Sequence, residues 1–430
     1  MEYKNNPYDL IHFINDATSP FHVVEKSISL LEEAGFEKID VTKKWALKKG
    51  KSYYTAPYGS VLFAFTIPDD LENSNFRIAA AHTDHPCLRI KPIAEICEGD
   101  YLKVDTGIYG GPILNTWLDR PLSIAGKVSL KSDDIFHPGT KLVDFKRPIL
   151  TIPNLAIHFD NTINKGVELN KQTDMLPLAG MMGENICKKD YFIKFLAKEI
   201  DADPEDILDF DLFIYNAEPG QIIGMNGDFI SCPRLDNLTS VFSCINGIIN
   251  SHRTTGINII ALFDNEEVGS LTKQGADSNL LTIILEKIYH SFAFEQSAFY
   301  ESIMRSFLLS VDVGHCLHPN KPEKNDPVNK NVLNGGFVIK IDLNQKYAFD
   351  TEAIAVIQQI CIANNIEYQK FINRSDIVGG STLGAMVSSK LPMNTVDVGV
   401  PLLAMHSARE LMGSKDQESL NSLIKAFFMA

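Results

Sequence analysis

The chain has 430 residues, which exceeds the roughly 250–300 residues that one hydrophobic core serves, so two domains are expected. Its 40 basic and 54 acidic residues give a net charge of −14, which argues against nucleic acid as a partner. No stretch reaches the roughly 18 apolar residues of a membrane helix. Seven cysteines without a C-x-x-C pair favour thiols in a reducing cytoplasm over a disulfide framework. We therefore expect a cytoplasmic protein that binds neither nucleic acid nor membrane.

The N-terminal region alternates between helical and strand-like patterns. Apolar residues at helical spacing predict helices over 7–16 and 21–34. Residues 60–67 and 76–81 read as strands, and the second is a nearly unbroken apolar run. Such a run is typical of a strand that is buried on both faces of a sheet.

The middle of the chain, residues 93–233, has a different sequence pattern. Short β-like runs follow one another, punctuated by proline and glycine: 123–130, 148–152, 155–159 and 210–215. We predict an inserted β-rich domain over 93–233. The catalytic domain would then comprise 1–92 and 234–430.

The C-terminal region returns to alternating strands and helices. The predicted strands are 257–263, 307–311, 336–341 and 395–400, and the predicted helices are 236–250, 279–292, 351–363, 381–389 and 414–428. Alternation of this kind predicts an α/β sandwich around a mostly parallel sheet.

Histidines and acidic residues follow the predicted strands. His82, the pair Glu266-Glu267, Asp312 and His406 each come after a strand, and Asp236 opens a predicted helix. Because ligands bind outside the carboxyl ends of strands in open α/β sheets, we expect these side chains to converge there.

This set of two histidines and four acidic residues suits two divalent cations that share one carboxylate, the arrangement of two-metal hydrolases. Three acidic residues within 264–267 are electrostatically costly unless cations neutralise them. We assign Glu267 to a metal and Glu266 as the general base, which must reach a water without binding the metal. Asp236 could bridge the cations or merely cap its helix, and Asp84 could orient the His82 imidazole. Oxygen-rich sites with histidine suit Zn²⁺, but also Mn²⁺ or Co²⁺.

Two further segments could face the substrate. His315 and His318 follow Asp312 closely, and either could support the metals or contact a substrate. The glycine-rich loop over 379–384 precedes a predicted helix, so the N–H groups around Gly380 could bind substrate or cap that helix.

Together these motifs resemble the M18, or aspartyl aminopeptidase, family of metallopeptidases, over essentially the whole chain. The motifs are AAHTDHPCLRIKP (80–92), IPNLAIHFD (152–160), SCPRLDNL (231–238), FDNEEVGS (263–270), GHCLHPN (314–320), VGGSTLG (378–384) and LAMHSARE (403–410). The resemblance implies a phosphorylase/hydrolase-like zinc-peptidase α/β sandwich with an inserted β-rich domain. It also implies assembly as a homododecamer, with the inserted domain serving oligomerisation or acting as a lid.

The resemblance also implies roles for individual residues. One zinc would be held by His82, Asp236 and Asp312, and the other by Asp236, Glu267 and His406. Glu266 would be the general base, and Asp84 the carboxylate behind the histidine ligand. His158 would reach the active site of a neighbouring subunit and stabilise the tetrahedral intermediate.

Two positions leave alternatives open. In the family, the sequence that begins at the first ligand is similar to HTDSP. Here His85 stands where serine is usual, and its role stays open. Lys340 resembles a pocket cation that could hold an acidic substrate side chain, and an exposed surface lysine is the competing interpretation.

We therefore predict a dinuclear metalloaminopeptidase that removes N-terminal residues from peptides, possibly with a preference for Asp or Glu. The alternatives are a carboxypeptidase or N-acyl amino-acid deacylase, for which Arg374 or Arg409 could supply the required cation, and a non-catalytic scaffold of the same fold.

Overall fold

The computed structural model describes residues 6–71, 75–181 and 190–430. The chain forms two compact units. The core unit comprises residues up to Asp84, Gly220–Met405 and Glu410–Ala430, and the insert unit comprises His85–Pro219 with His406–Arg409. The insert therefore begins and ends earlier than the predicted 93 and 233. The reason is that β5 (Cys87–Glu98) already pairs with insert strands, whereas β11 (Gln221–Ile223) and β12 (Phe229–Cys232) belong to a core-unit sheet.

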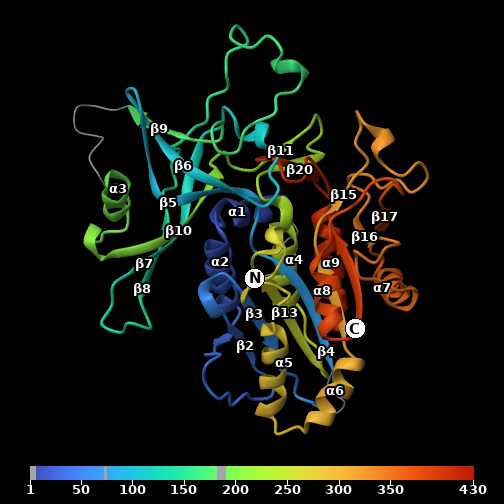
Figure 1. The fold of residues 1–430 in the computed structure, drawn as a ribbon. Helices are drawn as coiled ribbons and strands as arrows, with labels where there is room; N and C mark the ends of the chain where they lie inside the picture. Colours follow the sequence, from blue (N-terminus) through green and yellow to red (C-terminus); the bar gives the residue numbers. More distant parts are fainter. Residues whose placement is uncertain (1–5, 72–74, 182–189) are drawn as a thin grey trace. The chain divides into compact units, whose positions relative to one another are not determined.

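Within the described residues, a nine-stranded sheet organises the core unit (Figure 1). Its central strands β13, β4, β14 and β18 run parallel, and antiparallel neighbours flank them. In spatial order the strands are β1 (Glu37–Lys38), β2 (Ser52–Thr55), β3 (Leu62–Thr66), β13 (Ile257–Phe263), β4 (Phe76–His82), β14 (Phe307–Val311), β18 (Asn394–Gly399), β16 (Phe337–Ile341) and β17 (Tyr368–Ile372). The parallel centre sends the carboxyl ends of β4, β13 and β14 to one edge.

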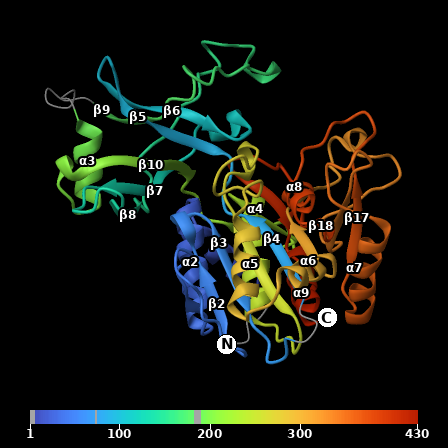
Figure 2. The same ribbon diagram turned by 60° about the horizontal axis from the view of Figure 1, so that its bottom comes forward.

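Two hydrophobic clusters cover the two faces of this sheet. Ile260 and Leu262 of β13 belong to one cluster, whereas Ile259 and Ala261 belong to the other, as strand alternation requires. The first cluster includes α1 (Pro7–Asp16), α2 (Pro20–Glu33), α4 (Leu235–Ile249), α7 (Thr351–Asn364) and α9 (Asp416–Met429). The second includes α5 (Leu280–Ser291), α6 (Gln296–Met304) and α8 (Leu383–Lys390) (Figure 2). The predicted α/β sandwich is confirmed.

A smaller sheet completes the core unit. Among the described residues it has five strands: β11, β12, β20 (Glu410–Gly413), β19 (Pro401–Leu403) and β15 (Gly314–His315). Neither β15 nor β20 was predicted, because strands of two and four residues are too short to show an alternating pattern. No helix in the described part of the chain is long and apolar enough to cross a membrane.

The insert unit is built on a six-stranded sheet, as far as the chain is described. Its order is β8 (Gly139–Asp144), β7 (Leu122–Leu130), β10 (Ile207–Asn216), β5, β6 (Tyr101–Tyr109) and β9 (Leu178–Met181), with every pairing antiparallel. The helix α3 (Tyr191–Glu199) accompanies it. The predicted β-rich character is therefore present.

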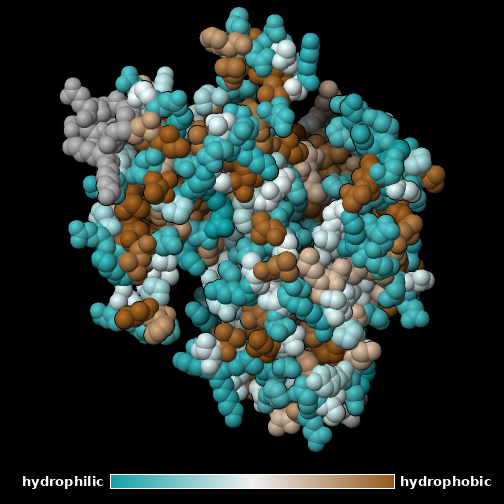
Figure 3. All heavy atoms as spheres, in the orientation of Figure 1, coloured by the Kyte–Doolittle hydropathy of each residue, from teal (hydrophilic) through white to brown (hydrophobic). Residues whose placement is uncertain are grey.

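Two predicted insert strands are wrong. Residues 148–152 contribute only isolated bridges at Leu150 and Thr151, and 155–159 lie in an irregular loop that turns at 157–159. Leu155, Ile157 and Phe159 are exposed, so their apolar character does not reflect burial within this unit. Figure 3 shows that hydrophobic side chains lie among polar ones on the visible face of the protein.

The cysteines largely agree with the expectation of thiols. Cys87, Cys232, Cys244, Cys316 and Cys361 are buried and free. Cys97 on β5 is disulfide-bonded, which departs from that expectation.

Candidate metal centre

Three predicted ligands meet at the carboxyl edge of the nine-stranded sheet. His82 is the last residue of β4, and Asp312 follows the last residue of β14, its parallel neighbour. Asp236 lies at the start of α4 with non-helical backbone angles, so it does not simply continue the helix. The topology thus brings together residues that are far apart in the sequence.

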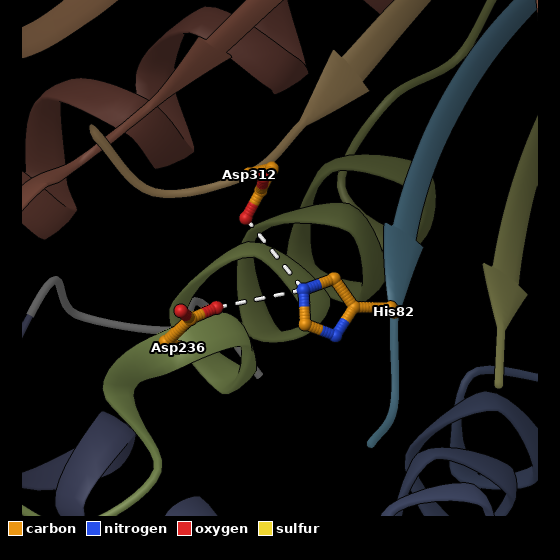
Figure 4. A group of neighbouring side chains, drawn as sticks. All are labelled: His82, Asp236 and Asp312. Carbon is orange, nitrogen blue, oxygen red and sulfur yellow. Dashed lines mark ion pairs between the residues drawn. The ribbon is translucent and has the colours of Figure 1, made fainter. Parts of the chain in front are cut away.

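These three side chains form a buried cluster (Figure 4). The Nε2 atom of His82 lies 3.4 Å from Oδ1 of Asp236 and 3.6 Å from Oδ1 of Asp312. One ligand atom from each residue lies within 4.8 Å of the others. An imidazole nitrogen facing two carboxylate oxygens is a donor set that suits zinc, so the residues fit a divalent cation here.

Asp84 supports the cluster in two ways. Its main-chain oxygen lies 3.0 Å from Nδ1 of His82, closer than its carboxylate oxygen at 3.4 Å. The two carboxylate oxygens each accept a backbone N–H, from Glu266 and from Glu267, both at 3.1 Å. Asp84 therefore orients the imidazole and also anchors the loop that carries both glutamates. The second role was not predicted.

Glu266 and Glu267 lie in a single turn of 3₁₀ helix immediately beyond β13. The turn spans Glu266–Val268, with Asn265 before it and Gly269 after it in left-handed conformations. His82, Glu266 and Glu267 form a second group of ligand atoms that all lie within 4.8 Å of one another. The Oε2 atom of Glu266 lies 4.0 Å from Nε2 of His82.

The crowded carboxylates perturb the titration of this cluster. Burial lowers the pKa of His82, but Asp236, Asp312 and Asp84 together raise it well above its ordinary value. Burial raises the pKa of Glu266 to about 8, with additional contributions from nearby carboxylates and opposition from His82. Perturbed acids and bases at one buried point are typical of functional sites. A divalent cation would relieve the concentration of negative charge.

Glu410 is a buried residue of this site that was not predicted. Its Oε2 atom accepts the backbone N–H of Asp236 at 3.0 Å, which fixes the main chain at the proposed bridging aspartate. The signal was available, because Glu410 closes the motif LAMHSARE at 403–410.

Lys340 lies beside Asp312 and is buried, so the surface alternative is wrong. Its Nζ atom is 3.1 Å from Oδ2 of Asp312. Burial opposes the charge of Lys340, but Asp312 and its other neighbours hold its pKa above the ordinary value. Burial likewise raises the pKa of Asp312, but Lys340 and His82 outweigh it and leave that pKa lowered.

His318 and Gly380 share a separate cavity in the core unit. This cavity has a volume of about 300 Å³ and is also lined by Lys324 and Arg374, whereas Lys340 is not among its lining residues. Gly380 lies in the loop before α8, and a side chain added there would meet open space. The cavity offers positive charge and an accessible backbone.

The remaining predicted residues belong to the insert unit. His158 is exposed on the loop with Leu155 and Phe159. His406 has a positive φ of 67°, and its Nδ1 lies 3.1 Å from the main-chain oxygen of Gly111 in the same unit. His85 is buried at the start of the unit.

Comparison with known proteins gives consistent matches over the whole chain. The family described as "Aminopeptidase I zinc metalloprotease (M18)" matches residues 13–428. A probable M18 family aminopeptidase 2 of Clostridium novyi (strain NT) is 44% identical over 422 residues, covering 98% of each chain. Aspartyl aminopeptidase 4 of Saccharomyces cerevisiae is 36% identical, covering 98% of this chain and 94% of the relative.

Solved structures give the same result for the fold. A chain from the complex of Ape4 and Nbr1 superposes with a TM-score of 0.94 at 33% identity, covering 98% of this chain and 85% of that one. The mApe1 dodecamer of S. cerevisiae gives a TM-score of 0.84 at 25% identity, covering 98% and 96% of the two chains.

Proposed function

The chain belongs to the M18 family of zinc metalloaminopeptidases, and we propose that it releases N-terminal residues from peptides at a dinuclear metal centre. The observation that carries this proposal is the buried group of His82, Asp236 and Asp312, whose ligand atoms lie within 4.8 Å of one another. We assign these three residues to one cation. By the match of its motifs to the family, we assign Asp236, Glu267 and His406 to the other.

When bound, two zinc ions would supply Lewis-acid polarisation of the scissile carbonyl and an acidified water. Mn²⁺ or Co²⁺ could also occupy an oxygen-rich site with histidine. The chain itself supplies the proton transfer. Glu266 is largely buried beside the ligands, and its backbone N–H is held by Asp84. We assign Glu266 to accept a proton from water and to pass it to the leaving amine.

For the substrate, we propose peptides with an acidic N-terminal residue. Two observations support this preference. One relative is an aspartyl aminopeptidase, and the cavity lined by His318 and Gly380 also presents Lys324 and Arg374. Arg374 already pairs with Asp376 at 2.8 Å, so Lys324 is the better candidate to attract a substrate carboxylate.

The direct test is release of p-nitroaniline from Asp, Glu, Leu and Met derivatives, with and without chelator, on wild type and Glu266→Gln. Activity on Asp and Glu that both treatments abolish is expected. Activity on Leu or Met alone would keep the mechanism and discard the acidic preference. Activity only on N-acetylated substrates would overturn the proposal in favour of a deacylase.

No observation favours the deacylase or carboxypeptidase alternative. Each needs a cation for a substrate carboxylate. Arg374 forms a bidentate pair with Asp376 and also donates to the main chain of Glu323. Arg409 donates to main-chain oxygens of Glu218 and Pro219 within the insert unit.

We also propose that the protein assembles as a homododecamer in the cytoplasm. The similarity to the mApe1 dodecamer and the exposed apolar residues Leu155, Ile157 and Phe159 support assembly. In such an assembly, His158 on the same loop would serve a neighbouring subunit.

A mixing experiment tests this sharing of residues. Subunits with Glu266→Gln lack the base but carry His158, whereas subunits with His158→Ala have the reverse defect. Dissociating and reassembling the two inactive variants together should recover part of the wild-type activity. No recovery in mixed assemblies of confirmed size would contradict the shared site.

A further inference from the structure

Two arginines lie at the end of the nine-stranded sheet that is opposite to the metal centre. Arg77 is the second residue of β4, five residues before His82, which places it roughly 17 Å along the strand from that ligand. Arg253 lies in the loop between α4 and β13. Both residues belong to the core unit and are partly buried. This region is therefore separate from the site described above.

Both arginines gather around Asn75, which directly precedes β4. Nη2 of Arg253 donates to Oδ1 of Asn75 at 2.8 Å. Asn75 is itself fixed, because its Nδ2 donates to the main-chain oxygen of Arg305 at 3.2 Å and its main-chain oxygen accepts from Ile257 at 2.8 Å. Residues two apart in an extended chain point to the same side. Asn75 thus holds the guanidinium group of Arg253 on the side from which Arg77 projects.

The position of the Arg253 guanidinium group depends on a glycine beneath it. Gly256 directly precedes β13 and has a φ of 79°. A Cβ atom added there would come within 2.6 Å of Nη1 and 2.7 Å of Cζ of Arg253. The next residue, Ile257, pairs with Phe76 of β4. The guanidinium group is therefore packed against the backbone at the start of β13 and β4.

Neither arginine has an acidic partner in the part of the chain that the structure describes. Arg305, at the same end of the sheet, pairs with Glu301 at 3.7 Å, but Arg77 and Arg253 form no ion pair there. Among the described residues, Arg253 makes no side-chain hydrogen bond besides that to Asn75, and its Nη1 is buried without an acceptor. No carbonyl group at the ends of α4 or α9 accepts from either side chain within these ranges. Capping of a helix thus does not explain the pair.

One acidic residue lies along the same loop. The backbone of Asp70 bridges to Thr255, but its side chain is exposed and forms no ion pair with either arginine among the described residues. Burial and the charge of Arg77 lower the pKa of Arg253 to about 10, and burial lowers the pKa of Arg77. Two like charges in a partly buried place are costly unless an opposite charge neutralises them.

We propose that Arg77 and Arg253, the latter held by Asn75, form a binding site for a phosphate-type oxyanion. A guanidinium group presents a rigid fork of N–H donors that matches phosphate oxygens. A phosphate group carries close to two negative charges at neutral pH, which matches two arginines better than a carboxylate does. The buried Nη1 of Arg253 supplies a donor. The site is independent of the proposed peptidase function.

The test measures binding of radiolabelled inorganic phosphate to the zinc-loaded protein by equilibrium dialysis at constant ionic strength. Phosphate can also bind zinc, so the site is defined as the binding that Arg77→Gln or Arg253→Gln removes. Each substitution should weaken this binding about tenfold or more, because it removes charge-assisted hydrogen bonds. Phosphate binding that neither substitution changes would overturn the proposal.

The matched control is Arg305→Gln. Arg305 is exposed and paired with Glu301, so its loss removes one charge from the same end of the sheet without touching the proposed site. Wild-type phosphate affinity is expected for this variant. An equal loss in all three variants would show general attraction of anions to this end of the protein, and the specific site would fail.

Thermal unfolding gives a second measurement that does not depend on zinc-bound phosphate. An anion that binds only the folded protein raises Tm, but phosphate and sulfate also stabilise proteins in general. The informative quantity is therefore the rise in Tm that Arg253→Gln loses and Arg305→Gln keeps, with acetate as the weaker anion. If Arg253→Gln fails to fold, Arg253→Lys replaces it, because lysine keeps the charge without the fork.

Two further outcomes identify what occupies the site. Competition by phenyl phosphate as strong as that by inorganic phosphate would indicate the phosphate group of a larger molecule, and competition by inorganic phosphate alone would indicate the free ion. If phosphate does not bind and Arg253→Gln instead dissociates the assembled protein in light scattering, an acidic group of a neighbouring subunit neutralises the pair. That result would overturn the oxyanion site.

Discussion

The carboxyl edge of the nine-stranded sheet and the exposed loop of the insert unit hold their functional residues in opposite ways. At the sheet edge, His82, Asp84 and Asp312 are buried, and each makes hydrogen bonds or ion pairs with its neighbours. On the insert loop, His158 and the apolar residues beside it are exposed. The first arrangement is held by contacts within the core unit, whereas the role proposed for the second depends on a neighbouring subunit.

The largest effect at the sheet edge is expected from removing the proposed base, Glu266. Glu266→Gln should lower kcat by roughly 10²–10⁴-fold, because an amide cannot accept the proton. Zinc content by elemental analysis should stay at the wild-type value, since Glu266 is assigned beside the metals. Loss of zinc with the activity would show instead that Glu266 is a ligand.

The next test removes the shared anchor of the two glutamates. Asp84→Ala deletes the acceptors of the Glu266 and Glu267 backbone N–H groups, so zinc affinity should fall by about 10–100-fold. Chelator competition measures it. Asp84→Asn, which keeps one acceptor oxygen, should lose less. Equal losses would indicate that charge, and not anchoring, is what Asp84 provides.

The insert loop is tested through assembly. Phe159 is 82% exposed, and Phe159→Ser should weaken self-association by about 30-fold, the effect of losing one anchor of about 2 kcal/mol. Light scattering across a dilution series measures the shift. Phe136→Ser is the matched control, because Phe136 is 90% exposed in a different turn of the same unit. If both variants weaken self-association equally, the loop around Phe159 has no special role in assembly.

The smallest effect concerns pH. Because nearby carboxylates raise the pKa of the metal-free His82, protons compete with a metal ion for its imidazole as the pH falls. Zinc affinity should therefore fall about tenfold for each unit of decreasing pH per proton displaced. Calorimetry in buffers of different ionisation enthalpy measures the release. His318→Asn should keep the slope, and a flat profile in wild type would contradict the assignment.

The sequence predicted the sheet edge better than the insert. The apolar run at 257–263 and the strand at 307–311 match β13 and β14, and parallel pairing then places His82 and Asp312 together. These elements are buried on both faces, so their pattern is strong. The strand β5 was missed because it contains Pro92 and a bulge between Ile90 and Glu95.

Other failures came from interactions that a pattern cannot encode. Residues 155–159 read as a strand because apolar character was taken as burial. The surface alternative for Lys340 was wrong because its partner Asp312 lies 28 residues away along the chain. Glu410 was overlooked because its partner is the backbone of Asp236, 174 residues away.

The double contact of Asp84 has a consequence for transplanting this site into another protein. One carboxylate aligns both the residue assigned to the proton and the residue assigned to the metal. Residues 264–270 grafted alone would therefore lack the Asp84 carboxylate that holds Glu266 and Glu267 in position. The smallest portable module is two strand ends, 82–84 and 263–267, taken together. Any substitution of Asp84 that shifts Glu266 will also shift Glu267.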